Sequence, residues 1–169
     1  MSGKAYGVSL PIGIRGTVTR VADEVIGPFC HVGDDPIQYG AAVMYDATNK
    51  GVRKVLESDS AGTKIIGIAV RSIGQPKADN PNGYYYEKGE TVDVLLRGSI
   101  AVELEEATGI AAMGQVYVNP TTGELTAKAD HTPQGGSKVD HLAVPNCVFA
   151  TGAVDANNVA EVTITKRSI

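Results

Sequence analysis

The sequence predicts an all-β fold: a single compact β-barrel or β-sandwich domain, tulip-like in outline, with an extended N-terminal arm and little helix. Apolar and polar residues alternate repeatedly with the period of two that is typical of strands. Turns rich in glycine and proline separate these stretches at short intervals. The best helix candidate, residues 103–114, is interrupted by Thr108 and Gly109, so we expect helices to contribute little.

Residues 1–22 are predicted to form the arm, and residues 23–169 the body. The segment 1–22 holds four glycines and a proline, which disfavour a helix, and three basic residues without an acidic one. Its alternating apolar residues suit an extended peptide that adds to a sheet edge or groove of another protein. Packing across its own domain is the rival interpretation. The candidate partner contacts here are Tyr6, Leu10, Ile12, Ile14, Arg15 and Arg20.

The longest predicted strand covers residues 92–104. Its even-numbered positions from Val92 to Leu104 are apolar apart from Gly98, whereas Asp93 and Arg97 lie on the other face. The alternation continues across Gly98 without a change of phase. This indicates one strand with one inner face, bent at the glycine as at the corner of a barrel.

Shorter elements flank this strand. Residues 39–55 and 113–128 share a pattern of Gly, Val, a polar turn and renewed apolar residues, which predicts two β-hairpins at equivalent places in similar halves. Residues 64–73 are apolar on both faces and should be central, and residues 160–164 alternate as a closing strand. Within residues 141–150, Pro145 indicates an edge strand or a bulge.

Tyrosines mark one of two long polar loops. The loop 76–90 contains Tyr84, Tyr85 and Tyr86, and tyrosine is enriched at protein interfaces. We therefore treat these three as candidate partner contacts, with packing of one or two of them as the alternative. The second loop, residues 128–141, is rich in polar and small residues.

No motif predicts catalysis, a metal or a cofactor. The chain lacks a Gly-x-Ser-x-Gly elbow, a phosphate-binding loop and a paired-cysteine site. The Asp-His dipeptides at 130–131 and 140–141 match no established zinc-ligand spacing. We expect no enzyme activity and no small-molecule substrate. Cys30 and Cys147 each lie in an apolar stretch and are expected to be buried free thiols.

Charge and hydropathy limit the partners. The net charge is −4, and the residues after position 22 include 12 basic and 19 acidic side chains. An acidic body is repelled by a phosphate backbone, so we expect no nucleic-acid partner. No apolar run approaches the ~20 residues of a membrane-spanning helix, and no secretory signal is expected.

The order of several segments resembles the structural cement (capsid decoration) proteins of tailed bacteriophages. The segments are SLPIGIRGTVTR, YGAAVMYDATNKGVRKV, GIAVR, ETVDVLLRGSIAVEL and GQVYVNPTTGELT, and the resemblance runs from about residue 9 to residue 164. It implies a non-enzymatic virion protein, made late in the bacterial host cytoplasm. Such proteins attach to the outer head surface, commonly as homotrimers, and bridge major capsid subunits through an arm that corresponds here to residues 2–20.

Two other classes remain as alternatives. A small trimeric β-barrel nucleotide hydrolase has a similar size, although its metal and phosphate motifs are not found. A host-surface adhesin domain would use the tyrosine loop as its tip. Turnover assays would test the first alternative, and binding to cells by capsid-free protein would test the second.

Overall fold

The computed structural model describes residues 12–59, 64–72, 85–132 and 138–168. Within these ranges the chain forms thirteen strands and no helix, so the predicted all-β class is confirmed. No helix in the described ranges is therefore long and apolar enough to cross a membrane. The candidate helix at 103–114 is instead the end of a strand followed by turns.

Nine strands form one antiparallel sheet in the order β4-β3-β5-β7-β13-β12-β8-β9, with β1 paired to β7. Two small sheets, β2 with β6 and β10 with β11, complete the fold. The strands are β1 (Val18–Cys30), β2 (Ile37–Gln38), β3 (Ala42–Asp46), β4 (Gly51–Lys54), β5 (Ile65–Ala69), β6 (Tyr85–Tyr86), β7 (Thr91–Glu103), β8 (Gln115–Val118), β9 (Leu125–Thr126), β10 (Asp130–His131), β11 (Val139–Asp140), β12 (Leu142–Val154) and β13 (Val159–Ile164).

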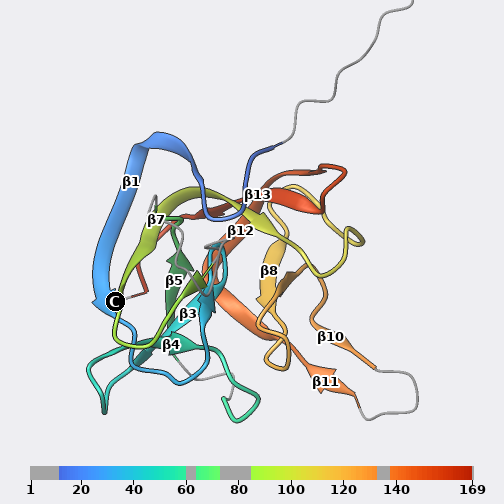
Figure 1. The fold of residues 1–169 in the computed structure, drawn as a ribbon. Helices are drawn as coiled ribbons and strands as arrows, with labels where there is room; N and C mark the ends of the chain where they lie inside the picture. The colour runs from blue at the N-terminus through green and yellow to red at the C-terminus, as the bar shows by residue number, and fades with distance from the viewer. Residues whose placement is uncertain (1–11, 60–63, 73–84, 133–137, 169) are drawn as a thin grey trace, which may run out of the picture.

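Strand β7 connects the two halves of the molecule. It is one strand, as predicted, and it pairs with β5 before Gly98 and with β13 from Gly98 onward. Gly98 has φ +123°, and a Cβ at this position would lie 3.1 Å from the Cα of Glu24 in β1. A larger residue would meet both backbone strain and the neighbouring strand, which explains the glycine at the bend. Figure 1 shows β7 curving between the two groups of strands.

The prediction of a single inner face for β7 is wrong. Val92 and Val94 pack into one buried cluster, whereas Ile100 and Val102 pack into another. Leu95, at an odd-numbered position, belongs to the second cluster. Even-numbered residues of β7 therefore face one cluster before Gly98 and the other cluster after it. The positive φ of Gly98 rotates the strand at this point. A period-two pattern cannot reveal this rotation.

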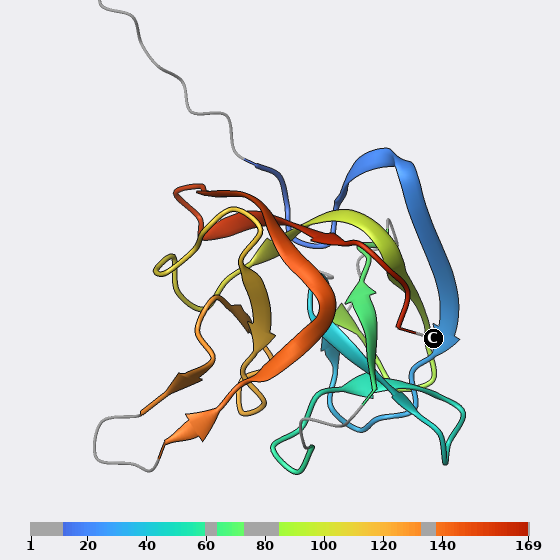
Figure 2. The same ribbon diagram turned by 180° about the vertical axis from the view of Figure 1, so that it is seen from behind.

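The sheet does not close into a continuous barrel. At its two end strands, isolated parallel bridges take the place of a further ladder. His31, directly after β1, bridges to Val52 of β4, and Leu104, directly after β7, bridges to Leu125 of β9. Figures 1 and 2 show β1, β3, β4 and β5 on one side and β8 to β11 on the other, with β7 and β13 crossing between them. The arrangement is sandwich-like, and its core consists of two buried clusters. The larger cluster joins β3 and β5 to β7 and to the strands from β8 onward, whereas the smaller cluster contains residues of β2 to β7 only.

The shorter predicted elements are confirmed. β3 with β4 and β8 with β9 are the two hairpins, and they occupy the two ends of the sheet. β5 lies between β3 and β7 with all five residues buried. β12 is not an edge strand, since it lies between β13 and β8; Pro145 falls instead within the register shift between Ala143 and Val148, as the bulge alternative requires.

Candidate functional site

The first described residues of the predicted arm are fixed to the body. We call residues 12–20 the arm root. The amide of Gly16 donates to the carbonyl of Ala101 at 2.7 Å, and the amide of Ala101 donates to the carbonyl of Thr17 at 2.9 Å. The amide of Arg71 donates to the carbonyl of Gly16 at 2.7 Å. The root is thus hydrogen-bonded to β7 and to the segment that follows β5.

β1 begins at Val18, inside the range 1–22 assigned to the arm. Val18 and Arg20 pair with Ile100 and Ser99 of β7, and a register shift follows before Val25. The last residues of the predicted arm are therefore strand residues of the main sheet. The division into an arm at 1–22 and a body at 23–169 stays a prediction.

Gly16 lets the root approach the body closely. It has φ +78°, and a Cβ on it would lie 2.9 Å from the Cβ of Tyr39 and 3.0 Å from the amide nitrogen of Arg71. Upstream, the amide of Ile12 donates to Oδ2 of Asp155 at 3.2 Å, in the turn between β12 and β13. These contacts fix residues 12–17 against the body.

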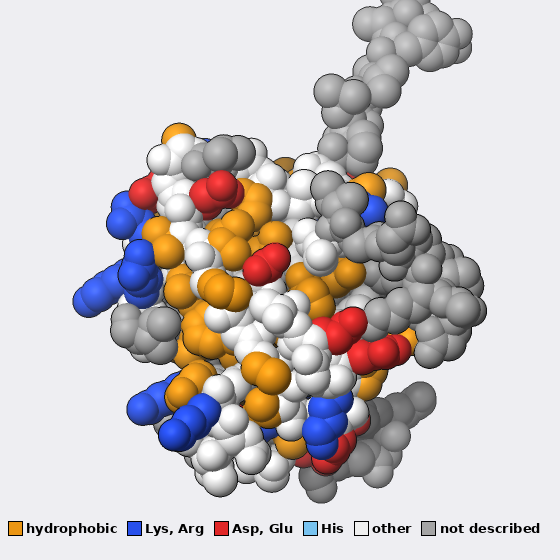
Figure 3. Space-filling model, turned by 60° about the vertical axis from the view of Figure 1, so that its left-hand side comes forward, with side chains coloured by type: hydrophobic (Ala, Val, Ile, Leu, Met, Phe, Trp, Pro, Cys, Tyr) orange, Lys and Arg blue, Asp and Glu red, His pale blue; other side chains and the backbone are white. Residues whose placement is uncertain are grey.

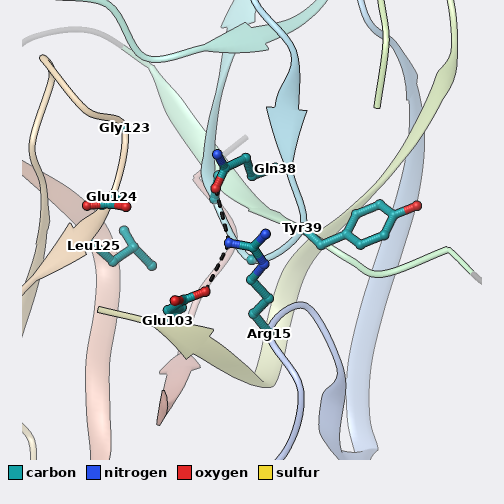
Figure 4. A pocket seen from close by; sticks show the side chains of 9 residues that line it. Arg15, Gln38, Tyr39, Glu103, Gly123, Glu124 and Leu125 are labelled. Carbon is teal, nitrogen blue, oxygen red and sulfur yellow. Dashed lines mark hydrogen bonds and ion pairs between the residues drawn. The ribbon is translucent and has the colours of Figure 1, made fainter. Parts of the chain in front are cut away.

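The side chain of Arg15 links two separate parts of the sheet structure by hydrogen bonds. Its Nη1 donates to Oε2 of Glu103 at 2.9 Å, at the end of β7, and to Oε1 of Gln38 at 3.2 Å, in β2. Figure 4 shows the guanidinium between these two acceptors, whereas the ring of Tyr39 points away from it. The side chain of Arg15 is 24% exposed, so most of it is covered by the body.

Glu124, from the turn between β8 and β9, lines the same small pocket. Burial raises the pKa of this carboxyl, and the nearby carboxylates of Glu105 and Glu103 raise it further. Arg15 acts in the opposite direction by stabilising the charged form. The pocket thus gathers negative charge around the arginine of the root.

Arg20 forms a two-point ion pair with Glu161 of β13. Its Nε donates to Oε1 and its Nη2 to Oε2 of that glutamate, both at 2.9 Å. The hydroxyl of Thr19 also donates to Oε1 of Glu161, at 2.5 Å. The hydrogen bond from Arg20 is the main reason that the pKa of Glu161 lies below its ordinary value. The Arg20 side chain is 62% exposed, so its outer part faces solvent.

Apolar side chains are exposed beside the root. Ile14 is 53% exposed and lines a groove with Val18, Val70 and Arg71. Ile26 on β1 is also exposed. Figure 3 turns the β1 side of the molecule toward the viewer and shows hydrophobic side chains spread across that face, with lysines and arginines along one margin. The same view shows acidic side chains among the hydrophobic ones, so this face offers apolar contact together with charges of both signs.

The two cysteines differ. Cys147 is buried, as predicted, but Cys30 is exposed, so the prediction for Cys30 is wrong. Cys30 ends β1, where alternate side chains point outward from a strand that pairs on one side with β7. Apolar neighbours in the sequence do not reveal this outward position.

The tyrosine cluster is divided between core and surface. Tyr86 is buried, donates from its hydroxyl to the carbonyl of Val70 at 2.6 Å and packs edge-on against Tyr39. Burial raises the pKa of its phenol to about 12. Tyr85 is half-buried, so of the two described tyrosines in this cluster it is the one that a partner can contact. Tyr84 lies outside the described residues.

Two further candidates, Tyr6 and Leu10, also lie outside the described residues. The root therefore contains the four described arm candidates, Ile12, Ile14, Arg15 and Arg20. Tyr85 and Tyr86 lie elsewhere, on β6. Sequence reasoning missed Glu103 and Glu161, which hold the two arginines. Both glutamates stand at the polar positions of their strands, and pairing them with the arm requires knowledge of the register of β7 and β13.

No metal site is assembled in the described ranges, where no three His, Cys, Asp or Glu side chains converge. The two Asp-His dipeptides lie on β10 and at the end of β11, and their histidine rings contact each other. Their carboxylates pair instead with Lys138.

The fold and the site together define an all-β protein with an arm root fixed to the body and an exposed face that carries apolar and charged side chains. The family model described as "Structural cement protein (E217 gp24/Pam3 gp6)" matches residues 2–165. The chain therefore belongs to the phage structural cement proteins, as its resemblance predicted. It is a capsid-associated structural protein of the phage virion.

A solved structure gives the same fold. One chain from a structure titled "The capsid of Myoviridae Phage XM1" is 20% identical, with a TM-score of 0.72 and 99% of each chain covered. At this identity the similarity supports the architecture over the full length. No curated protein matches the chain.

Proposed function

We propose that this protein decorates the outer surface of a phage head as a homotrimer and bridges neighbouring major capsid subunits through its N-terminal arm. The observation that carries the proposal is the match to the cement family over residues 2–165. The acidic body supports the outer position, since it would be repelled by packaged DNA. The role is structural, without an enzymatic step, a cofactor or a nucleic-acid partner.

The arm root would hold such an arm at a fixed place on the body. Hydrogen bonds at Gly16 and Thr17 fix the root to β7, which gives the arm a defined point of attachment on the body. Leu10, Ile12 and Ile14 supply apolar contacts to the capsid, and Ile14 is already exposed. Three arms on one trimer would add avidity, so that contacts of modest strength give durable attachment.

Arg15 and Arg20 supply the polar part of the attachment by pairing with capsid carboxylates. In the free chain each arginine pairs with a glutamate of its own body. Capsid binding therefore exchanges one carboxylate for another, which keeps the charge of each arginine compensated. Arg20 is better placed for this exchange, because its side chain is more exposed than that of Arg15.

A matched pair of substitutions tests the proposed surface. Ile14→Asp places a charge on an apolar residue of the root that is 53% exposed, and Met113→Asp places the same charge on an apolar residue outside the root that is 68% exposed. Both variants are mixed with undecorated phage heads and sedimented. We expect Ile14→Asp to reduce binding at least tenfold and Met113→Asp to bind like the natural protein. Equal binding by both variants would contradict the assignment of the root as a capsid contact.

A further inference from the structure

Two histidines close the small β10–β11 sheet through their rings. Nδ1 of His131 lies 2.8 Å from Nε2 of His141, and the ring centroids are 5.0 Å apart. Nδ1 of His141 lies 2.7 Å from the carbonyl oxygen of Lys128. The amide of His141 also donates to the carbonyl of Ala129 at 2.8 Å. We call the two rings and the Lys128 carbonyl the histidine clasp.

The hydrogen-bond acceptors in the clasp determine which ring nitrogens carry a hydrogen. A carbonyl oxygen only accepts, so Nδ1 of His141 carries a hydrogen and donates to Lys128. In the neutral pair, Nε2 of His141 is then the acceptor, and Nδ1 of His131 donates to it. One added proton is compatible with this chain of hydrogen bonds, because one ring can still accept. Two added protons would place an N–H on both facing nitrogens and break the contact.

Several charged side chains lie near the clasp. Lys138 on the loop side bridges Asp130 and Asp140 at 3.0 and 3.2 Å. Glu106, which pairs with Lys128, faces His131. Glu57 and Asp59 line the cavity beside His141, and Asp59 is held by Arg53. None of these groups changes the geometry of the facing ring nitrogens, so a second added proton still leaves the contact without an accepting nitrogen.

We propose that the histidine clasp is an acid-sensitive contact: it holds the β10–β11 hairpin closed and is broken when both rings become protonated. The closed hairpin holds at most one added proton, whereas an open hairpin holds two. A free histidine is half-protonated at about pH 6.5, so opening takes up one extra proton below that pH. The side chain of His141 is 7% exposed when closed, which adds the cost of burying its charge. This inference is independent of the capsid-binding role.

Hydrogen exchange measures the opening directly. Protection of the amides in residues 128–132 and 138–141 is followed in the full chain between pH 7 and 4.5, corrected for the intrinsic effect of pH on exchange. With one extra proton bound in the open state, we expect protection to fall about tenfold for each pH unit below about pH 6. Peptides from β5 and β7 serve as the internal reference for global unfolding. Protection of the hairpin that stays constant over this range would overturn the proposal.

Three variants separate the histidines from the carboxylates around them. His141→Gln and His131→Asn each leave one histidine facing an amide that can donate or accept, so the pH dependence should disappear in both. Lys138→Gln removes the two aspartate bridges but keeps the rings, so the tenfold dependence should remain. The opposite pattern, with dependence lost in Lys138→Gln and kept in the histidine variants, would also overturn the proposal.

A second measurement applies to the natural protein if a histidine variant fails to form the hairpin. Nuclear magnetic resonance of the imidazole nitrogens follows the protonation of both rings in the same pH range. We expect two separate steps, of which the second coincides with the loss of hairpin protection. Two charged rings in a hairpin that remains protected would contradict the clasp.

Discussion

Gly16 and Gly40 pack backbone against backbone where the arm root meets the body. Both have φ +78°, and a Cβ on Gly40 would lie 3.1 Å from the amide nitrogen of Gly16. Because neither residue carries a side chain, the root can sit close enough to β7 for its hydrogen bonds with Ala101. The position of the arm root on the body therefore depends on a contact between two glycines that are 24 residues apart in the sequence.

Gly16→Ala should destabilise the protein through both strain and a clash. The positive φ costs an alanine about 1 kcal/mol, and contacts of 2.9 and 3.0 Å with Tyr39 and Arg71 add an overpacking cost. We expect a total loss of about 3 kcal/mol in the free energy of unfolding, measured by urea denaturation. Gly89→Ala is the control, because Gly89 has φ +86° with no atom near its Cβ position. A loss no larger than that of the control would show that the close approach is unimportant.

Two N-terminal truncations should differ in stability. Removal of residues 1–11 leaves the arm root intact, so we expect a change below about 0.5 kcal/mol in unfolding free energy. Removal of residues 1–20 eliminates the hydrogen bonds with Ala101 and Arg71 and both arginine ion pairs. At about 1 kcal/mol for each hydrogen bond, the longer deletion should cost roughly 3 kcal/mol. Equal stability of the two proteins in thermal and urea unfolding would mean that the root is not part of the folded body.

The ion pair between Arg20 and Glu161 should make stability depend on pH. The pKa of Glu161 in the folded chain is below its ordinary value of 4.5, so the pair stabilises the protein above that pH. This contribution is lost as pH falls through the lowered pKa and the carboxyl becomes protonated. Glu161→Gln should therefore be less stable than the natural protein at pH 7, and the difference should shrink toward pH 3. A difference that is independent of pH would exclude a charged pair as its cause.

The two thiols should react very differently. Cys30 is exposed, whereas burial raises the pKa of the Cys147 thiol to about 12. Because the thiolate is the reactive form, a maleimide or an aromatic disulfide should modify one thiol per folded chain and a second only on unfolding. Mass spectrometry of the modified peptides identifies the residue. Rapid modification of Cys147 in the folded protein would contradict its burial.

The strand pattern could be predicted from the sequence, but the contacts of the site could not. Alternation along residues 92–104 and 160–164 depends only on local periodicity, and both strands form. The change of face at Gly98 depends on a backbone angle, and periodicity contains no information about it.

The arm shows the same distinction. Its glycines, proline and apolar residues predicted an extended segment, and Ile14 and Arg20 are indeed found on the surface. The acidic partners of Arg15 and Arg20 are Glu103 in β7 and Glu161 in β13, which follow 88 and 141 residues later in the chain. Such pairs depend on the register of the sheet, which no short motif encodes.

Attachment through the arm is tested most directly by sedimentation with undecorated phage heads. The natural protein and the variant lacking residues 1–11 are each sedimented alone and mixed with heads, and the bound protein is quantified. We expect the natural protein to be a trimer when free and to coat the heads, and the shortened protein to remain folded and trimeric but unbound. Full decoration of the heads by the shortened protein would contradict the proposal that the arm holds this protein on the capsid.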